Sequence, residues 1–175
     1  HHTPAGCLDA LAARGADLDA PYVTGHQSTP FIMSAHNDAT DAARALAARG
    51  ADVRRTNAYG ATSVAVAAAL GHADVLQVLL RVDPRGAQTV DQNGAAPLHV
   101  AAARGRTSSV AALLRAGAPA DATWRGLTPI DIARRNGHGH VVRLLATRAI
   151  DAGVSANEVT PDDASRHLRS PLPSP

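Results

Sequence analysis

The sequence predicts an all-α solenoid, a stack of short helix pairs in which each pair covers its neighbour. Leucines at positions 46, 79, 113 and 145 close short apolar segments at intervals of 33, 34 and 32 residues. Glycines recur in the same register before, within and after these units. Of the 175 residues, 39 are alanine and only four are aromatic, so the core must be thin and built from small side chains. A bulky β-sandwich core is therefore unfavourable.

Each unit is predicted to contain two short helices. In the most regular unit, Leu98, Ala101 and Ala102 lie on one face of the first helix, and Val110 and Leu113 on one face of the second. These spacings are helical. Segments of about eight to eleven residues are too short to be stable alone, so neighbouring units must stack to bury their apolar faces.

Prolines and glycines mark where the helices begin and end. Pro30, Pro97 and Pro129 fall at the first turn of the first helix, where the missing N–H costs nothing and the fixed φ is already helical. Gly50 and Gly117 follow the second helix, where glycine readily takes the left-handed conformation. We therefore expect the same turns in each unit.

The unit at 91–102, with the sequence Asp-Gln-Asn-Gly-Ala-Ala-Pro-Leu-His-Val-Ala-Ala, closely resembles an ankyrin repeat. The likeness continues through Gly105, Val110, Leu113-Leu114 and Gly117-Ala118, and the period of about 33 residues matches. The resemblance covers residues 8–153. It implies an ankyrin-repeat solenoid of helix pairs joined by β-hairpin fingers, in which the fingers and first helices line a concave face. It also implies a module that binds another protein.

No unit keeps the family's complete Thr-Pro-Leu-His helix start. The four starts read Thr29-Pro30-Phe31-Ile32, Thr62-Ser63-Val64-Ala65, Ala96-Pro97-Leu98-His99 and Thr128-Pro129-Ile130-Asp131. In the family, threonine and histidine tie the finger to the helix by hydrogen bonds. Where one partner is missing, this network must be rebuilt or lost.

The array is expected to contain four full units and an N-terminal half. The expected segments are the half-repeat 1–21, repeats at 22–56, 57–90 and 91–123, a capping repeat at 124–153, and a tail at 154–175 with a short helix starting near Thr160. The half-repeat supplies only a second helix. It either follows an upstream helix that is missing here, which we slightly favour, or caps the stack.

Three departures from the repeat pattern carry structural expectations. Arg134 replaces the small residue found at Ala35, Ala68 and Ala102, which indicates the end of stacking. The last helix is expected to run an extra turn to Gly153. Two loops differ from the others: 82–86 replaces a Gly-Ala exit and adds a residue, and 22–28 is two residues longer.

The positions that do not serve stacking are the fingers and the outward side of the first helices, and we expect a partner to bind there. These candidate partner-binding residues are Tyr22, His26, His36, Tyr59, Gln92, Trp124, Arg125 and Arg135. Tyr59 and Trp124 are the expected anchors, because exposed aromatic and arginine side chains are frequent hot spots. The alternative, which we slightly favour, is that the finger-tip rings pack on the neighbouring finger.

A small-molecule or catalytic protein is the alternative function. It would use a pocket near His26, His36 and Asp38, with imidazole and carboxylate acting as base and acid. The structural explanation is stronger, because Asp38 takes a glycine position where Asn and Asp tolerate left-handed backbone and cap the next helix. No nucleophile stands at a recognisable spacing from these residues.

No cofactor or metal is expected. Cys7 is the single cysteine, and in the pair His138 and His140 the first histidine takes the slot of His72, where the family commonly has histidine after glycine. A Walker-type nucleotide loop is excluded because the chain has no lysine.

Charge and hydropathy argue against two further classes of partner, nucleic acid and membrane. All 17 basic residues are arginines scattered among 14 aspartates, which suits a GC-rich, bacterial-type coding sequence better than a nucleic-acid surface. The longest apolar run, 64–70, is far short of the about 20 residues of a membrane helix. We therefore predict a non-enzymatic, cytoplasmic protein-interaction module.

Overall fold

The computed structural model describes residues 15–21 and 27–151, which form short helices joined by loops. The helices are α2 (Pro30–His36), α3 (Thr40–Ala48), α4 (Ser63–Leu70), α5 (Ala73–Val82), α6 (Pro97–Ala103), α7 (Thr107–Arg115), α8 (Pro129–Arg135) and α9 (Gly139–Asp151), with a 3₁₀ turn, η1 (Pro84–Ala87), after α5.

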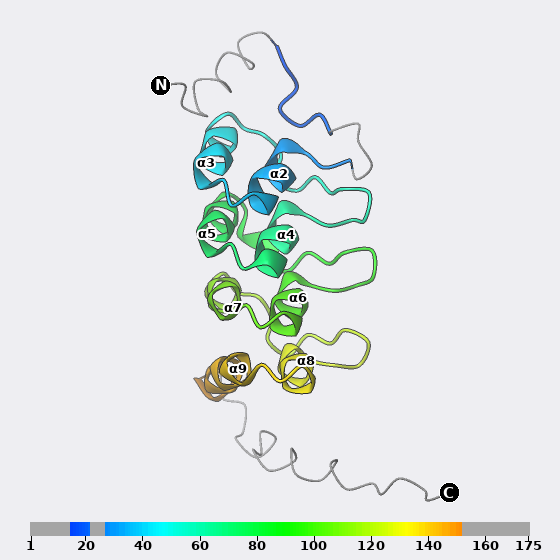
Figure 1. Cartoon of the computed structure of the whole chain (residues 1–175), viewed down its shortest axis with the longest axis vertical. Coiled ribbons are helices and arrows are strands. Elements are labelled where there is room, and N and C mark those ends of the chain that lie inside the picture. The colour runs from blue at the N-terminus through cyan, green and yellow to red at the C-terminus, as the bar shows by residue number, and fades with distance from the viewer. Residues whose placement is uncertain (1–14, 22–26, 152–175) are drawn as a thin grey trace, which may run out of the picture.

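The helices form two parallel rows (Figure 1). An inner row contains α2, α4, α6 and α8, and an outer row contains α3, α5, α7 and α9. Each helix contacts its pair partner and the next helix of its own row. Loops project sideways from the inner row as fingers. The predicted all-α solenoid of stacked helix pairs is confirmed.

The inner helices begin where proline and threonine predict. Pro30, Pro97 and Pro129 each occupy the first turn. At the starts of α2 and α4, the Oγ1 atoms of Thr29 and Thr62 accept a hydrogen bond from the backbone N–H three residues later. Each cap satisfies one of the N–H groups that a helix start leaves without a partner.

The threonine–histidine network is rebuilt differently in the last two units. At the start of α6, where Ala96 has no side-chain acceptor, His99 Nδ1 accepts the Ala96 N–H at 3.3 Å and His99 Nε2 donates to the Ala122 carbonyl at 2.9 Å. At the start of α8, Asp131 takes the histidine's place and accepts hydrogen bonds from both the N–H and the hydroxyl of Thr128. A partial motif thus still holds the helix start.

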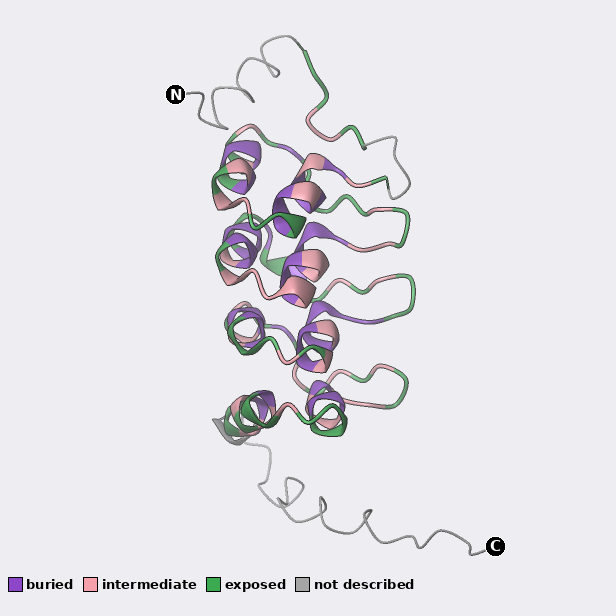
Figure 2. Cartoon of the chain, in the orientation of Figure 1, coloured by how far each residue is buried: buried purple, intermediate pink, exposed green. Residues whose placement is uncertain are grey.

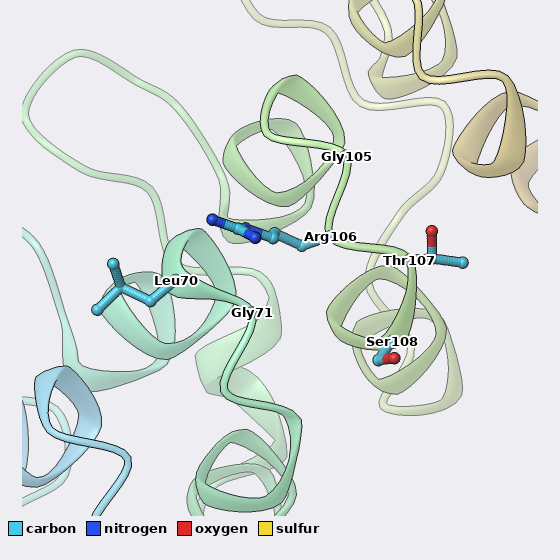
Figure 3. Close-up of a pocket in the computed structure, with 6 residues that line it drawn as sticks. All are labelled: Leu70, Gly71, Gly105, Arg106, Thr107 and Ser108. Atoms are coloured by element: carbon cyan, nitrogen blue, oxygen red, sulfur yellow. The ribbon is translucent and has the colours of Figure 1, made fainter.

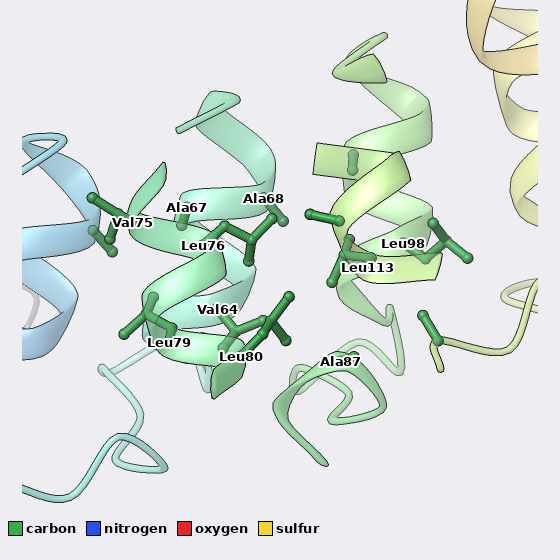
Figure 4. Close-up of a cluster of buried hydrophobic side chains, with 14 of the residues drawn as sticks. Val64, Ala67, Ala68, Val75, Leu76, Leu79, Leu80, Ala87, Leu98 and Leu113 are labelled. Atoms are coloured by element: carbon green, nitrogen blue, oxygen red, sulfur yellow. The ribbon is translucent and has the colours of Figure 1, made fainter. Parts of the chain in front are cut away.

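A continuous apolar core lies between the two rows (Figures 2 and 4). Leu76, Leu79 and Leu113 have no exposed surface, and Leu98 is 1% exposed. Because residues from successive units contribute to one cluster, no single helix pair encloses its own core. The stability of the array is therefore collective.

The turns between inner and outer helices are tied from one unit to the next. A side chain just after the mid-unit glycine reaches back to a carbonyl near the end of the preceding inner helix. His72 Nδ1 donates to Ala35 O at 2.8 Å, and His138 Nε2 donates to Ala103 O at 3.0 Å. In the unit between them, Arg106 Nε makes the equivalent contact at 3.4 Å. His138 therefore has a structural role, as expected from the histidine after glycine.

The last helix is longer than the other outer helices, with 13 residues against nine in α3 and α7 and ten in α5. It is described as far as Asp151. The expected helix before Gly15, the loop residues 22–26, the end at Gly153 and the helix from Thr160 lie outside the described residues. Within the described part of the chain, no helix combines the length and apolar character needed to cross a bilayer.

Candidate functional site: the finger surface

Three fingers are described completely, and we name them by a residue near each tip. The Tyr59 finger spans 56–62, the Gln92 finger 90–96 and the Trp124 finger 124–128. Their pairing is minimal: bridges join Thr56 to Thr62 and Trp124 to Leu127, and no extended strand forms within the described residues. The fingers are thus tight hairpin turns.

Side chains within the turns hold the first two fingers. Asn57 Oδ1 accepts hydrogen bonds from the N–H groups of Tyr59 and Ala61, both at 3.0 Å. Asp91 Oδ1 makes the same two contacts in the next finger, at 2.8 and 2.9 Å. Asn and Asp favour turns because the short side chain can bond the backbone in this way.

The Trp124 finger has a different turn. Arg125 and Gly126 both have positive φ, 54° and 74°, and Trp124 and Leu127 exchange two backbone hydrogen bonds. This is a two-residue hairpin of the type I′ kind, which requires positive φ at both central positions. The turn folds the Arg125 guanidinium over the Trp124 ring, 4.9 Å from its centroid.

Hydrogen bonds link each finger to the one before it. Gln92 Nε2 donates to Ala58 O at 3.3 Å, and Trp124 Nε1 donates to Asn93 O at 2.8 Å. The Trp124 ring also lies 6.3 Å from the buried His99 ring. For Trp124, packing on the neighbouring finger is therefore confirmed, and any role in binding stays a prediction.

The tip residues face solvent at equivalent positions of the three fingers. Tyr59, Asn93 and Arg125 are all exposed, and Tyr59 is 58% exposed, a large value for an aromatic side chain. Asn93 was not among the predicted site residues. The repeat register could have identified Asn93, because Asn93 stands one residue before the finger glycine, as Tyr59 and Arg125 do.

The remaining predicted residues lie on the inner row or outside the described residues. His36 is exposed at the end of α2, and Arg135 is exposed at the end of α8. Arg104, the residue directly after α6, is exposed at the same edge of the row. Tyr22 and His26 fall in the segment that the structure does not describe.

An ion pair joins Arg54, just before the Tyr59 finger, to Asp83, directly after α5. Arg54 Nε donates to Asp83 Oδ2. This hydrogen bond raises the pKa of Arg54 and lowers the pKa of the Asp83 carboxyl below its usual value. Because 64% of the Arg54 side chain is exposed, the pair contributes little stability.

His36 and Asp38, proposed as base and acid in the alternative function, do not pair with each other. His36 Nδ1 donates to Asn37 Oδ1 at 3.2 Å. Asp38 is exposed with φ of 54°, as the structural explanation predicts. The expectation that this segment caps the next helix is wrong, because α3 begins after Ala39 without a side-chain cap.

Two depressions lined entirely by described residues lie away from His36 and Asp38. One, of about 250 Å³, lies at the turns between helices and is lined by Leu70, Gly71, Gly105, Arg106, Thr107 and Ser108 (Figure 3). It is open to solvent. Among the described residues, no three histidine, cysteine or acidic side chains are grouped to hold a metal ion.

Comparison with known proteins agrees with this geometry. The family model described as "Ankyrin repeats (3 copies)" matches residues 82–156. Cyclin-dependent kinase 4 inhibitor B from Bos taurus is 35% identical over 115 residues, which cover 63% of this chain and 85% of the bovine protein. The chain belongs to the ankyrin-repeat family. Its departures from the ankyrin pattern are therefore local changes within a shared architecture.

Asp38 is one such change in the ankyrin register. Gly71, Gly105 and Gly137 hold the same position with φ of 89°, 67° and 76°. We expect Asp38→Gly to raise the free energy of unfolding by about 0.5–1 kcal/mol, because it relieves the left-handed strain of a residue with a Cβ. Urea unfolding followed by circular dichroism measures this change. A loss of stability would show that the Asp38 side chain contributes contacts that outweigh the strain.

Proposed function

We propose that this protein is a non-enzymatic interaction module that binds a partner protein through its fingers and the exposed side of its inner helices. The observation that carries the proposal is the row of exposed tips, Tyr59, Asn93 and Arg125, on fingers joined to one another by side-chain hydrogen bonds. Tips held in this way lose little freedom on binding, so more of the contact energy remains as affinity.

The inner row extends the proposed surface beyond the fingers. His36, Arg104 and Arg135 are exposed near the ends of α2, α6 and α8, and these helices lie side by side. Tyr59 and Arg125 are the residue types that most often dominate interface energies. A partner that spans the tips and this edge would bury them together.

The similarity to the bovine protein supports a protein as the partner. Its name describes an inhibitor of cyclin-dependent kinase 4, so that relative acts on another protein. Ankyrin repeats offer a rigid extended surface whose specificity resides in a few variable side chains. The tips of this chain are such side chains.

The tip residues can be tested by substitution. We expect the double variant Tyr59→Ala and Arg125→Ala to bind the partner at least about tenfold more weakly, because each change removes a candidate hot spot. The measurement is quantitative mass spectrometry of proteins retained from the source cell by wild-type and variant protein immobilised side by side. Proteins lost with the variant are then purified and titrated individually.

The matched control is Arg44→Ala and Arg148→Ala, which removes exposed side chains from the outer helices α3 and α9. This control should retain every partner, and both variants should unfold at the same urea concentration as wild type. If the tip variant retains the same partners at the same affinity, the finger surface is not the binding site.

A further inference from the structure

Another depression lies on the outer row of helices, away from the fingers. It is a shallow, open depression of about 390 Å³ between the last turn of α5, the end of α7 and η1. Neither α5 nor α7 contributes to the fingers, and Figure 1 shows both in the row farther from them. We name it the outer-face depression; its lining consists of Gln77, Leu80, Arg81, Pro84, Ala112, Arg115 and Ala116.

The unusual exit from α5 forms one wall of this depression. After α3 and α7 the chain leaves through Gly50-Ala51 and Gly117-Ala118, but after α5 it makes the 3₁₀ turn η1. Asp83 caps this turn by accepting the Arg85 N–H at 3.1 Å, while its other oxygen pairs with Arg54. Pro84 is thereby held at the surface.

The 3₁₀ turn is also fixed from below. A Cβ built on Gly86 would stand only 2.8 Å from a methyl group of Val64, so glycine allows the turn to approach α4 this closely. Ala87, next in the chain, has no exposed surface. The wall is therefore part of the packed structure, and a ligand would not need to order it.

The chemistry of the outer-face depression is apolar at its floor and basic at its rim. Leu80 and Ala112 are 7% and 4% exposed and form the floor with Ala116. Arg81 and Arg115 line the rim and are exposed. Neither makes a hydrogen bond or ion pair with another described residue, and no acidic side chain lines the depression.

The nearest acidic residue in sequence does not neutralise this rim. Asp83 is only 10% exposed in its side chain and is already paired with Arg54. The two guanidinium groups thus remain available to carboxylates from outside, and guanidinium matches the planar fork of a carboxylate. A protruding apolar side chain would fit the open floor better than a small molecule, which usually needs an enclosed cleft.

We propose that the outer-face depression docks an acidic segment of a second protein, with one apolar side chain on the floor and carboxylates on either side against Arg81 and Arg115. Charge complementarity and the preformed wall carry the proposal. The site is separate from the finger surface, so the protein can hold two partners at once and join them. The proposal does not depend on what binds the fingers.

The test uses a fluorescein-labelled peptide in which a central leucine is flanked on both sides by aspartate and glutamate. We expect saturable binding by fluorescence anisotropy. We also expect Arg81→Ser with Arg115→Ser to weaken binding about tenfold, since each exposed ion pair contributes up to about 1 kcal/mol. The control Arg44→Ser with Arg148→Ser removes the same charge from the same row and should bind like wild type.

Three further results would overturn the proposal. One is equal binding of a peptide with serine in place of leucine, which would mean that the floor plays no part. Another is tighter binding of a thymidine oligonucleotide of equal charge, which would identify a phosphate site. The third comes from NMR titration with the peptide. The backbone amide shifts should centre on Ala112 and Ala116; shifts centred on Tyr59 and Arg125 would place the peptide on the fingers instead.

Discussion

Replacing Ala102 with arginine is expected to uncouple the array at its centre. Ala102 on α6 has no exposed surface, and Ala35 and Ala68 hold the same position in the two preceding units, also without exposed surface. An arginine there would overfill a closely packed site and bury a charge without a partner. The expected loss is about 4 kcal/mol or more, which is a large part of the stability of a domain of this size.

The matched control for this change is Arg134→Ala, at the equivalent position on α8. Arg134 is 41% exposed in its side chain and makes one surface ion pair, 3.5 Å from Asp131. Its removal should change stability by no more than about 0.5 kcal/mol. Urea unfolding and limited proteolysis of both variants give the comparison. If Ala102→Arg unfolds at the wild-type urea concentration, the small-residue position is not required for stacking.

The repeat period and the helix starts could be predicted because their causes are local and recur in each unit. Pro30, Pro97 and Pro129 set φ at the first turn wherever they occur, and the leucine register follows from helical spacing. Each unit repeats the same local sequence pattern, so helix limits found in one unit predict those in the others. The fold class therefore followed from the sequence without knowledge of any contact between units.

The sorting of the finger residues could not be predicted, because it depends on turn geometry and on contacts about 30 residues apart. Tyr59, Gln92 and Trp124 were all candidates for partner contact. Gln92 and Trp124 reach back to the preceding finger, and Tyr59 lies at a tip with 58% of its surface exposed. All three fingers carry glycine three residues before the first residue of the helix, so the sequence pattern does not distinguish the type I′ turn at Arg125 from the others.

The outer-face depression could not be predicted from sequence for a similar reason. The sequence shows that 82–86 is an irregular exit with an added residue, but it does not show which structure this exit forms. That outcome depends on how closely Gly86 approaches Val64 and on the pairing of Asp83 with Arg54, which lie in different units. Irregularities within a repeat are thus located by sequence, while their consequence is decided by packing against the neighbouring units.

His99 is expected to give the array a pH-dependent stability. It is 2% exposed, and burial lowers its pKa below the ordinary value of 6.5, against the opposing effect of its hydrogen bonds to backbone at Ala122 and Ala96. Nδ1 accepts the Ala96 N–H and Nε2–H donates to Ala122 O, so the folded protein holds the neutral ring. A proton on Nδ1 would remove the acceptor for Ala96.

The direction of the effect follows from this difference in pKa. As pH falls below 6.5, His99 takes up a proton in the unfolded chain before it does so in the folded protein. The unfolded state then binds more protons, and the free energy of unfolding decreases. The contribution of His99 is complete above pH 6.5 and is lost as pH falls through the lower pKa of the folded state.

Two substitutions separate the packing of His99 from its titration. At pH 7.5, His99→Ala is expected to cost about 3 kcal/mol, because it leaves the buried Ala96 N–H and the half-buried Ala122 carbonyl without their partner and opens a cavity beside Trp124. His99→Gln stays neutral at every pH, so its free energy of unfolding should fall less than that of wild type between pH 7.5 and 5. Urea unfolding at both pH values measures this. Equal decreases in wild type and His99→Gln would mean that the ring is not held neutral by the fold, and that the pH dependence arises from other groups.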